Sequence, residues 1–217
     1  MKDKYTLAEI EGYLRKAAQA VGLDWGIAEE AGKSARWLAA FGLPGPELML
    51  AQLQQLEGKD YHNFIPDCRA GQWRAKSACL CPIITGAALA DRATAMLEGG
   101  VIKLARVAHP LLLAATVGQA AHYHQTVFTT KWAGVSVHCF ENGLSVEGNR
   151  EDLLITEVDS ATCRQGQASI SLQIPSTLAY AVDTQIWAEI DRLAFRTYAP
   201  ATAESRAGAG AGMIDND

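Results

Sequence analysis

The hydrophobic pattern of this chain changes at Gly99-Gly100, and that change limits the folds open to it. Before this point apolar residues recur at the three-to-four spacing of amphipathic helices. After it, β-rich segments dominate, apart from an apolar run that begins at Pro110 and a helical stretch that begins at Asp183. The pattern predicts an α+β fold with N-terminal helices, a central mostly antiparallel sheet, a C-terminal helix and an extended tail.

Three helices are expected in the first 60 residues. Thr6-Leu7-Ala8-Glu9 has the form of a capping box, which starts the first helix, and Gly22 ends it. The second is expected from Asp24 to Phe41, and the third from Pro46 to about Gly58. Residues 58–82 suggest an irregular but packed connection. A fourth helix is expected at 85–98.

The second half is expected to hold strands and two helices. Asn142-Gly143 lies between alternating segments and predicts a hairpin. One helix is expected from Pro110 to about Tyr123, and a closing helix is expected after a cap at Asp183. The expected strands cover residues 101–107, 126–132, 135–140, 144–147, 153–159 and 168–174.

Length and composition favour one domain over residues 1–217. The chain has 217 residues, of which 49% are hydrophobic and 20% are charged, so it has enough apolar surface for a sizeable core. No internal repeat divides it. Within the domain we expect a mainly helical part, a mainly β part, a closing helix and a tail rich in Gly, Ala and Asp, at residues 1–100, 101–182, 183–197 and 198–217.

Charge and hydropathy exclude several partners. The net charge is −5 and no block of five like charges occurs, which argues against nucleic acid. The longest apolar run, from Pro110 to Ala121, is too short to span a bilayer, and the N-terminus lacks the apolar core of a signal peptide. We therefore expect a cytoplasmic location with no membrane partner. The odd cysteine count predicts reduced thiols at Cys68, Cys79, Cys81, Cys139 and Cys163.

The chain lacks the common catalytic and cofactor motifs. It has no Gly-x-Ser-x-Gly elbow, no phosphate-binding loop and no His-Glu-x-x-His. The glycines at 208–212 have no preceding strand and no following helix, so there is no nicotinamide or flavin motif and the cofactor is unknown. The histidines and cysteines lack zinc-site spacing, and no metal is expected. Core and interface packing explains the tryptophans, which are Trp25, Trp37, Trp73, Trp132 and Trp187.

Acidic residues open the second expected helix. Glu29 and Glu30 suit the positive end of the helix dipole, and Glu29 lies four residues before Lys33, the favourable order for a surface ion pair. General acid–base catalysis by these carboxylates is the alternative. Nothing in the sequence indicates that they are buried, so the surface pair is favoured.

The segment from Arg106 to Pro110 is the favoured catalytic position. It lies where an expected strand meets a helix N-terminus, which presents free amide groups to an anion. Arg106 could clamp a carboxylate or phosphate, and His109 could exchange a proton with a substrate. The alternative is an ordinary turn with a surface arginine.

The tail leaves two interpretations open. Residues rich in Gly, Ala, Ser and acids are typical of a flexible, solvated terminus. Alternatively, the glycines permit a close backbone approach and the tail forms an ordered strap over a pocket or onto a neighbouring subunit. In that case its ligand-binding residues are expected to be Tyr198, Arg206, Asp215 and Asp217.

Two segments resemble a bacterial family classified only as a domain of unknown function. The first runs from Asp24-Trp25-Gly26 through Glu29-Glu30 to Trp37-Leu38. The second contains Tyr198-Ala199-Pro200, Ser205-Arg206, the Gly-Ala-Gly-Ala-Gly run and Asp215-Asn216-Asp217. The resemblance implies a bacterial cytosolic protein and brings no known activity or ligand, but because it reaches the last residue it favours the strap.

Two functional hypotheses follow. The first is an enzyme or binding protein for a small anionic metabolite, with its site at Arg106 and His109. The second is a non-catalytic accessory or assembly protein that packs against a partner chain. Whether the chain catalyses a reaction stays open, and a homo-oligomer is compatible with both. An enclosed polar pocket would favour the first hypothesis, and a broad apolar patch the second.

Overall fold

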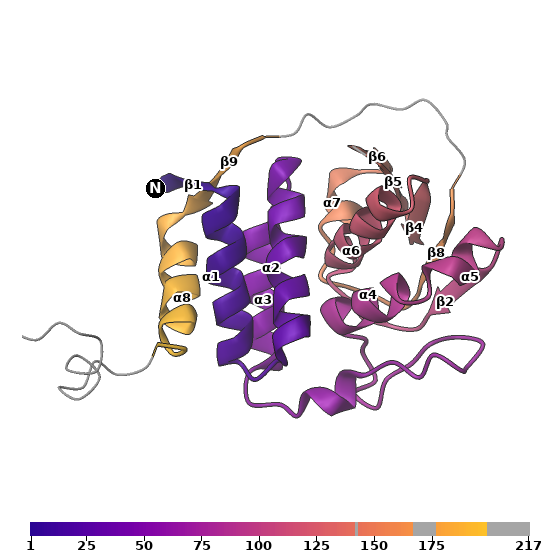
Figure 1. Cartoon of the computed structure of the whole chain (residues 1–217), viewed down its shortest axis with the longest axis horizontal. Coiled ribbons are helices and arrows are strands. Elements are labelled where there is room, and N and C mark those ends of the chain that lie inside the picture. Colours follow the sequence, from indigo (N-terminus) through magenta and orange to yellow (C-terminus); the bar gives the residue numbers. More distant parts are fainter. Residues whose placement is uncertain (142, 167–176, 199–217) are drawn as a thin grey trace, which may run out of the picture.

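The computed structural model describes residues 1–141, 143–166 and 177–198, and it confirms the α+β fold (Figure 1). The first half is helical, as expected. The predicted helix at 85–98 is instead two short helices, since the chain turns at Asp91 and Arg92. The elements of this half are α1 (Leu7–Ala20), α2 (Trp25–Ala40), α3 (Gly45–Leu56), the 3₁₀ turn Tyr61–Phe64, α4 (Pro82–Ala90) and α5 (Ala93–Leu97).

The capping box at the start of α1 is confirmed. The backbone amide of Glu9 donates to the Thr6 hydroxyl at 3.2 Å, and the Thr6 amide donates to the Glu9 carboxylate at 2.8 Å. These reciprocal bonds satisfy amides that the first turn of a helix leaves unpaired. On the neighbouring helix the expected surface pair also forms, with the Lys33 ammonium 3.9 Å from Glu29 and 2.9 Å from Glu30.

The main sheet has five antiparallel strands in the order β2-β8-β4-β5-β6. The predicted hairpin joins β5 to β6, and its last pair is Phe140 with Gly143. Of the two residues between them, Asn142 lies outside the described part of the chain, as does the strand predicted at 168–174. The strands are β2 (Val101–Leu104), β4 (Phe128–Trp132), β5 (Val135–Phe140), β6 (Gly143–Glu147) and β8 (Ala161–Gln165).

The prediction of a strand at residues 153–159 was wrong. Asn149 caps a short helix, α7 (Arg150–Leu153), because its side chain accepts the amide of Asp152 at 2.8 Å. Only β7 (Glu157–Val158) remains extended, and it pairs with β3 (Val107–Ala108) outside the main sheet. The predicted strand at 101–107 is likewise divided between β2 and β3.

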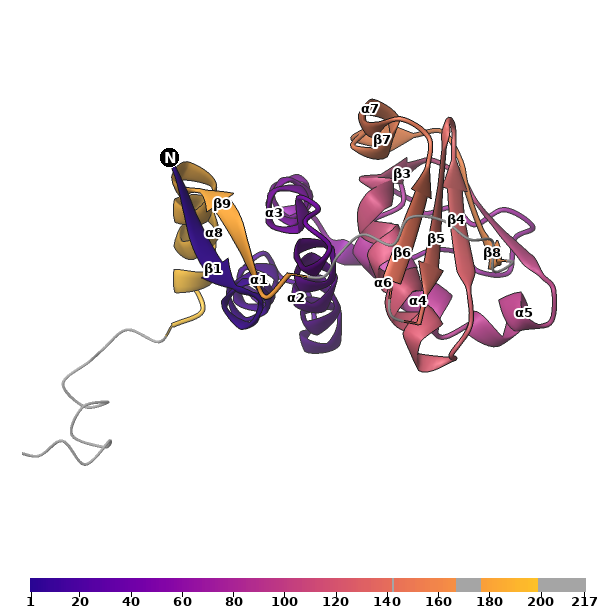
Figure 2. The same cartoon turned by 90° about the horizontal axis from the view of Figure 1, so that it is seen from above.

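Helix α6 (Pro110–Tyr123) is the centre of the molecule and begins and ends where the sequence predicted. Its apolar residues surround the helix axis, so the helix is stable only when it is covered on all sides. It packs against α2 and α4 on one side and against β4 and β5 on the other. Figure 2 shows these layers in order, from α1 and α8 through α2 to α6 and the sheet.

A second, two-stranded sheet closes the helical half. In it β1 (Lys2–Thr6) pairs antiparallel with β9 (Ala179–Asp183), and α8 (Thr184–Phe195) follows and packs on α1. The Asp183 carboxylate accepts the amide of Gln185 at 2.9 Å, which confirms the predicted cap. The rings of Tyr5 and Trp187 stack with centroids 3.6 Å apart and fasten α8 to β1.

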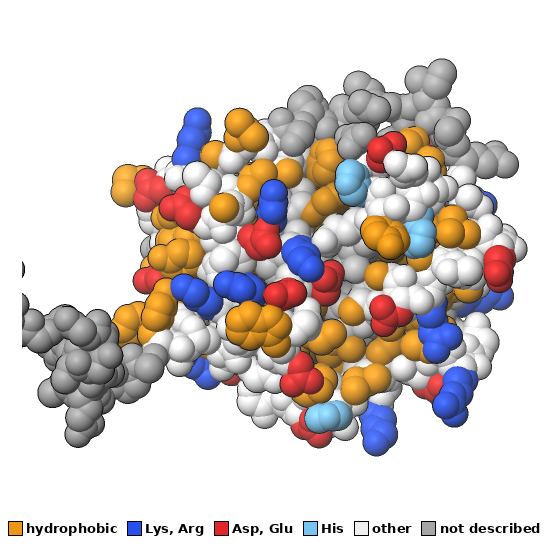
Figure 3. Space-filling model, in the orientation of Figure 1, with side chains coloured by type: hydrophobic (Ala, Val, Ile, Leu, Met, Phe, Trp, Pro, Cys, Tyr) orange, Lys and Arg blue, Asp and Glu red, His pale blue; other side chains and the backbone are white. Residues whose placement is uncertain are grey.

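The five tryptophans do not all pack in the core. Trp73 and Trp132 are buried, but the side chain of Trp25 is 62% exposed, so it does not pack in the core, and packing at an interface stays a prediction for it. Trp25 lies at the start of α2, where its indole nitrogen donates to Glu29 at 2.9 Å and Arg15 lies over its ring. The face shown in Figure 3 interleaves basic and acidic side chains with scattered apolar ones. Within the described residues, no helix is both long and apolar enough to cross a membrane.

Glu47, in the first turn of α3, gives a testable pH dependence. Burial raises the pKa of its carboxyl group, which lies beside Tyr180. A carboxyl group with a raised pKa in the folded state favours folding at low pH, and this contribution is lost as the pH rises through the folded-state pKa. We therefore expect Glu47→Gln to be more stabilising, relative to wild type, at pH 7 than at pH 4. Urea unfolding of both proteins at the two pH values measures the difference in the free energy of unfolding. An equal difference at pH 4 and pH 7 would contradict the prediction.

Candidate functional site

Two short extended segments, one at Leu80 and one at Val107, lie side by side, and each leads into a helix. Leu80 and Val107 form a parallel bridge, in which the Leu80 amide donates to the Arg106 carbonyl at 2.8 Å and the Ala108 amide donates to the Leu80 carbonyl at 3.1 Å. One segment continues into α4 and the other into α6, and both helices begin with a proline. Proline suits the first helical position because its fixed φ matches the helix and its missing N–H would be unpaired there. The parallel pairing therefore places two helix N-termini together.

Cys81 occupies the N-cap position of α4. Its side chain makes no capping hydrogen bond. Burial raises the pKa of this thiol to about 11, although the nearby amides of Ile83 and Ile84 oppose the shift. Cys81 is therefore a neutral thiol at pH 7, and it stands at a helix end that favours negative charge.

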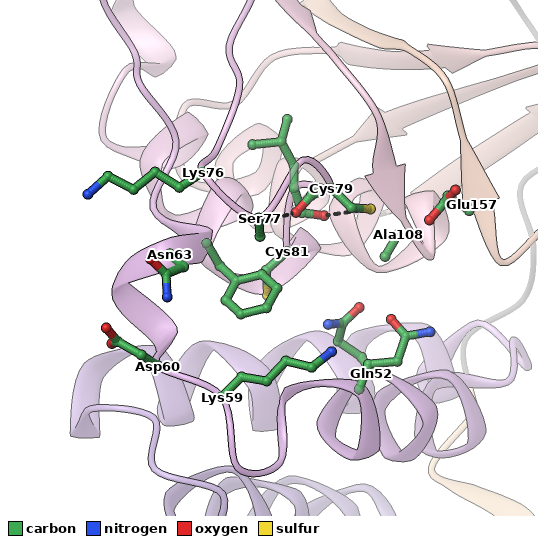
Figure 4. A pocket seen from close by; sticks show the side chains of 13 residues that line it. Gln52, Lys59, Asp60, Asn63, Lys76, Ser77, Cys79, Cys81, Ala108 and Glu157 are labelled. Carbon is green, nitrogen blue, oxygen red and sulfur yellow. Dashed lines mark hydrogen bonds between the residues drawn. The ribbon is translucent and has the colours of Figure 1, made fainter.

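A cavity of about 660 Å³ opens beside these N-termini (Figure 4). Its walls come from α3, from the connection between α3 and α4, and from β3 and β7. Figure 4 shows the ammonium of Lys59 reaching toward Gln52, whereas the ammonium of Lys76 points away from the centre. The lining residues are Gln52, Gln55, Lys59, Asp60, Asn63, Phe64, Lys76, Ser77, Cys79, Leu80, Cys81, Ala108 and Glu157.

Gln52 is the most deeply buried polar residue of this wall. Its side chain is 1% exposed, and its Oε1 atom has no hydrogen-bond partner within residues 1–141, 143–166 and 177–198. A buried carbonyl oxygen without a donor is unfavourable by about 1–3 kcal/mol. One turn further along α3, the side-chain nitrogen of Gln55 lies 3.5 Å from Nε2 of His109.

His109 lies directly before α6, as the sequence predicted, but its side chain is buried and not exposed to solvent. Only 2% of it is exposed, and burial lowers the pKa of its imidazole, so the ring is neutral at pH 7. Its backbone is left-handed, with φ of 40°, a conformation that is uncommon for residues other than glycine. Its Nε2 faces Gln55, while its Nδ1 has no partner in the described structure.

Neither His109 nor Arg106 lines the cavity, and the two side chains do not meet. Its guanidinium group is 51% exposed and lies 3.5 Å from both Glu157 and Asp159. The two side chains diverge because they belong to residues on either side of the short strand β3. Arg106 instead neutralises Glu157, a carboxylate of the cavity wall.

Cys79 is not an activated nucleophile. Burial, with a smaller contribution from the Glu157 carboxylate, raises the pKa of its thiol to about 11. The Ser77 hydroxyl donates to the Cys79 carbonyl at 2.7 Å, and the Ser77 amide donates to the Asn63 carbonyl at 2.9 Å. These bonds hold the wall segment against the 3₁₀ turn. In the described parts of the chain, no three His, Cys, Asp or Glu side chains are grouped as metal ligands.

The predicted ligand residues of the tail are not part of this cavity. Tyr198 lies just beyond α8, where the Lys16 ammonium is 4.5 Å from its ring centroid, and α8 lies on the far side of α1 (Figure 2). The other three, Arg206, Asp215 and Asp217, fall outside the described residues, and so does the predicted strap. Sequence reasoning missed Gln52 and Gln55, although two amides three residues apart on one predicted helix were a usable signal.

Comparison with known proteins identifies a family of unknown function. Residues 5–79 match the model of a family described as "Protein of unknown function (DUF3726)". The predicted resemblance to such a family is therefore confirmed for this stretch, which includes Asp24 to Leu38 and most of the residues that line the cavity. The C-terminal motif lies beyond the match. The bacterial origin and cytoplasmic location stay predictions.

Other comparisons add no function. No curated protein matches the chain. A malate dehydrogenase from Entamoeba histolytica is similar in structure, with a TM-score of 0.42 and 11% sequence identity. The match covers 79% of this chain and 51% of that one, so this chain spans about half the length of the dehydrogenase. A similarity of this size supports no inference about activity.

Proposed function

We propose that the cavity between α3 and the N-termini of α4 and α6 binds a small organic anion. The observation that carries the proposal is the Leu80–Val107 pairing, which brings the N-terminus of α4 and the segment that leads into α6 to one edge of the cavity, where Cys81 and Ala108 line it. Such termini attract negative charge through free amide groups and the helix dipole. The volume of about 660 Å³ falls within the range of small-molecule sites.

Lys59 supplies a positive charge at the proposed site. Its ammonium extends over the cavity toward Gln52 (Figure 4). Arg106 acts differently, because it balances Glu157 at the rim and so reduces the repulsion that an entering anion would meet. His109 is neutral and in contact with Gln55, which suits hydrogen bonding more than charge pairing.

The experiment is a thermal-shift screen of the full chain with small mono- and dicarboxylates and phosphate esters. A ligand present at about 100 times its Kd stabilises by about 2.7 kcal/mol, a rise in Tm of roughly 5–10 °C for a chain of this size. We expect Lys59→Gln to weaken binding of the best compound by about tenfold, as for a charge-assisted hydrogen bond. Lys103→Gln removes the same charge from β2, away from the cavity, and is the matched control.

Two results would argue against this proposal. One is the absence of any shift across the screen. The other is an equal loss of affinity in the Lys59 and Lys103 variants, which would indicate a general effect of charge rather than a site.

The accessory-protein hypothesis has one specific observation in its favour. Phe195 and Tyr198 are both exposed at the end of α8, with ring centroids 5.8 Å apart. Exposed aromatic side chains are enriched where proteins meet partners. The pair does not by itself identify a partner, and failure of the ligand screen would make this face the next one to test.

A further inference from the structure

The two sides of the cavity offer opposite hydrogen-bonding groups. On one side Lys59 supplies a donor, and Cys81 marks the N-terminus of α4. On α3, Gln52 contributes an acceptor, since its buried Oε1 has no donor in the described part of the molecule. An anion alone would engage the donors and leave this acceptor unpaired, which is unfavourable for a buried polar atom.

The wall also holds charges of both signs. Lys59 and Lys76 line the cavity together with Asp60 and Glu157, and Glu157 is paired with Arg106. A ligand with an anionic group and a separate hydrogen-bond donor would satisfy both sides. A plain carboxylic acid would satisfy one side only.

We propose that the ligand is a carboxylate that also carries a hydrogen-bond donor on a neighbouring carbon, an ammonium or hydroxyl group that binds Oε1 of Gln52. This inference rests on the proposed function and narrows it to the class of amino acids and hydroxy acids. Gln52 is the specificity-determining residue, because it distinguishes these compounds from acids of the same length that lack the donor. A site built around a polar group rejects an analogue that leaves that group unpaired.

The test uses sets of acids that differ at one carbon, with binding measured by calorimetry on the full chain. One set is propionate, lactate and alanine, and a second is glutarate, 2-hydroxyglutarate and glutamate. We expect wild type to bind at least one substituted acid about tenfold or more tightly than its plain counterpart. Tighter binding of lactate and 2-hydroxyglutarate would indicate a hydroxyl donor, and tighter binding of alanine and glutamate would indicate an ammonium donor.

Variants of Gln52 then assign the preference to one atom. Gln52→Leu should reduce the ratio between the affinities for the substituted and the plain acid to less than about threefold, mainly by weakening the binding of the substituted acid. Gln52→Glu keeps an acceptor and should retain the preference, shifted toward the ammonium compound by the added negative charge. Gln54→Leu is the matched control, because Gln54 is an exposed glutamine of the same helix outside the lining.

The outcomes separate the two proposals. If no acid of any set binds wild type, the proposed function fails. If plain and substituted acids bind wild type equally, the proposed function stands and this inference is wrong, whether or not the variants fold. A preference that persists in Gln52→Leu would also overturn it, because the discriminating acceptor would then lie elsewhere.

Discussion

Gly45→Ala is expected to destabilise the protein by about 3 kcal/mol, at the upper end of the usual cost of overpacking. A Cβ atom on Gly45 would lie 2.2 Å from the backbone oxygen of Ala35 and 3.0 Å from Cβ of Leu38. Neither atom belongs to a flexible side-chain end, so α2 and α3 would have to move apart. Because α3 carries Gln52 and Gln55, the same displacement would open the wall of the cavity.

Thermal unfolding measures this effect as a fall in Tm of roughly 6–12 °C for a chain of about 200 residues. Gly26→Ala is the control, because Gly26 also lies in the first turn of a helix but has open space where its Cβ would be. There Ala should raise stability by about 0.5 kcal/mol, since it restricts the unfolded chain and favours the helix. Equal effects at the two positions would show that helix propensity, and not the contact with α2, decides the outcome.

Trp73→Ala is expected to cost about 3–5 kcal/mol, as for other buried aromatic residues. Trp73 is 5% exposed, and it joins the long connection between α3 and α4 to the sheet. Its amide donates to the Lys103 carbonyl at 2.8 Å, and its carbonyl accepts the Ala105 amide at 2.9 Å. Loss of the ring leaves these backbone bonds without the apolar contacts that shield them.

The control for Trp73 is a residue of the same type. Trp25→Ala should cost less than about 1 kcal/mol, because that side chain is mostly exposed. Urea unfolding compares the two variants, and limited proteolysis at residues 58–82 reports whether the connection has come loose from β2. If both variants lose the same stability, or if cleavage is unchanged in Trp73→Ala, the proposed role of Trp73 as the anchor of this connection is wrong.

The helical elements were predictable because their signals are local. Thr6 and Glu9 form the capping box within one turn, and the boundaries of α6 follow from Pro110 and the apolar run behind it. The hairpin between β5 and β6 was also predictable, since the turn residues lie between its strands. In each case the residues that decide the structure are within about 14 positions of one another.

Other elements were missed because their partners are distant. The segment from Lys2 to Thr6 is too polar to indicate a strand, and it becomes one only by pairing with residues 179–183. The cavity requires residues near 52, 60, 80, 108 and 157 to meet, and no local pattern links them. Sequence did indicate the helix start at His109, but it could not indicate that Arg106 would be engaged by Glu157 and Asp159.

The pairing of β1 with β9 has a consequence for synthesis on the ribosome. The edge of β1 has no partner until residues 179–183 have been translated, although α1 to α3 are complete after residue 56. At about 5–20 residues per second, the nascent helices spend several seconds or more with that edge uncovered. During this interval the uncovered edge is open to pairing with another strand, and translation of residues 179–183 closes it.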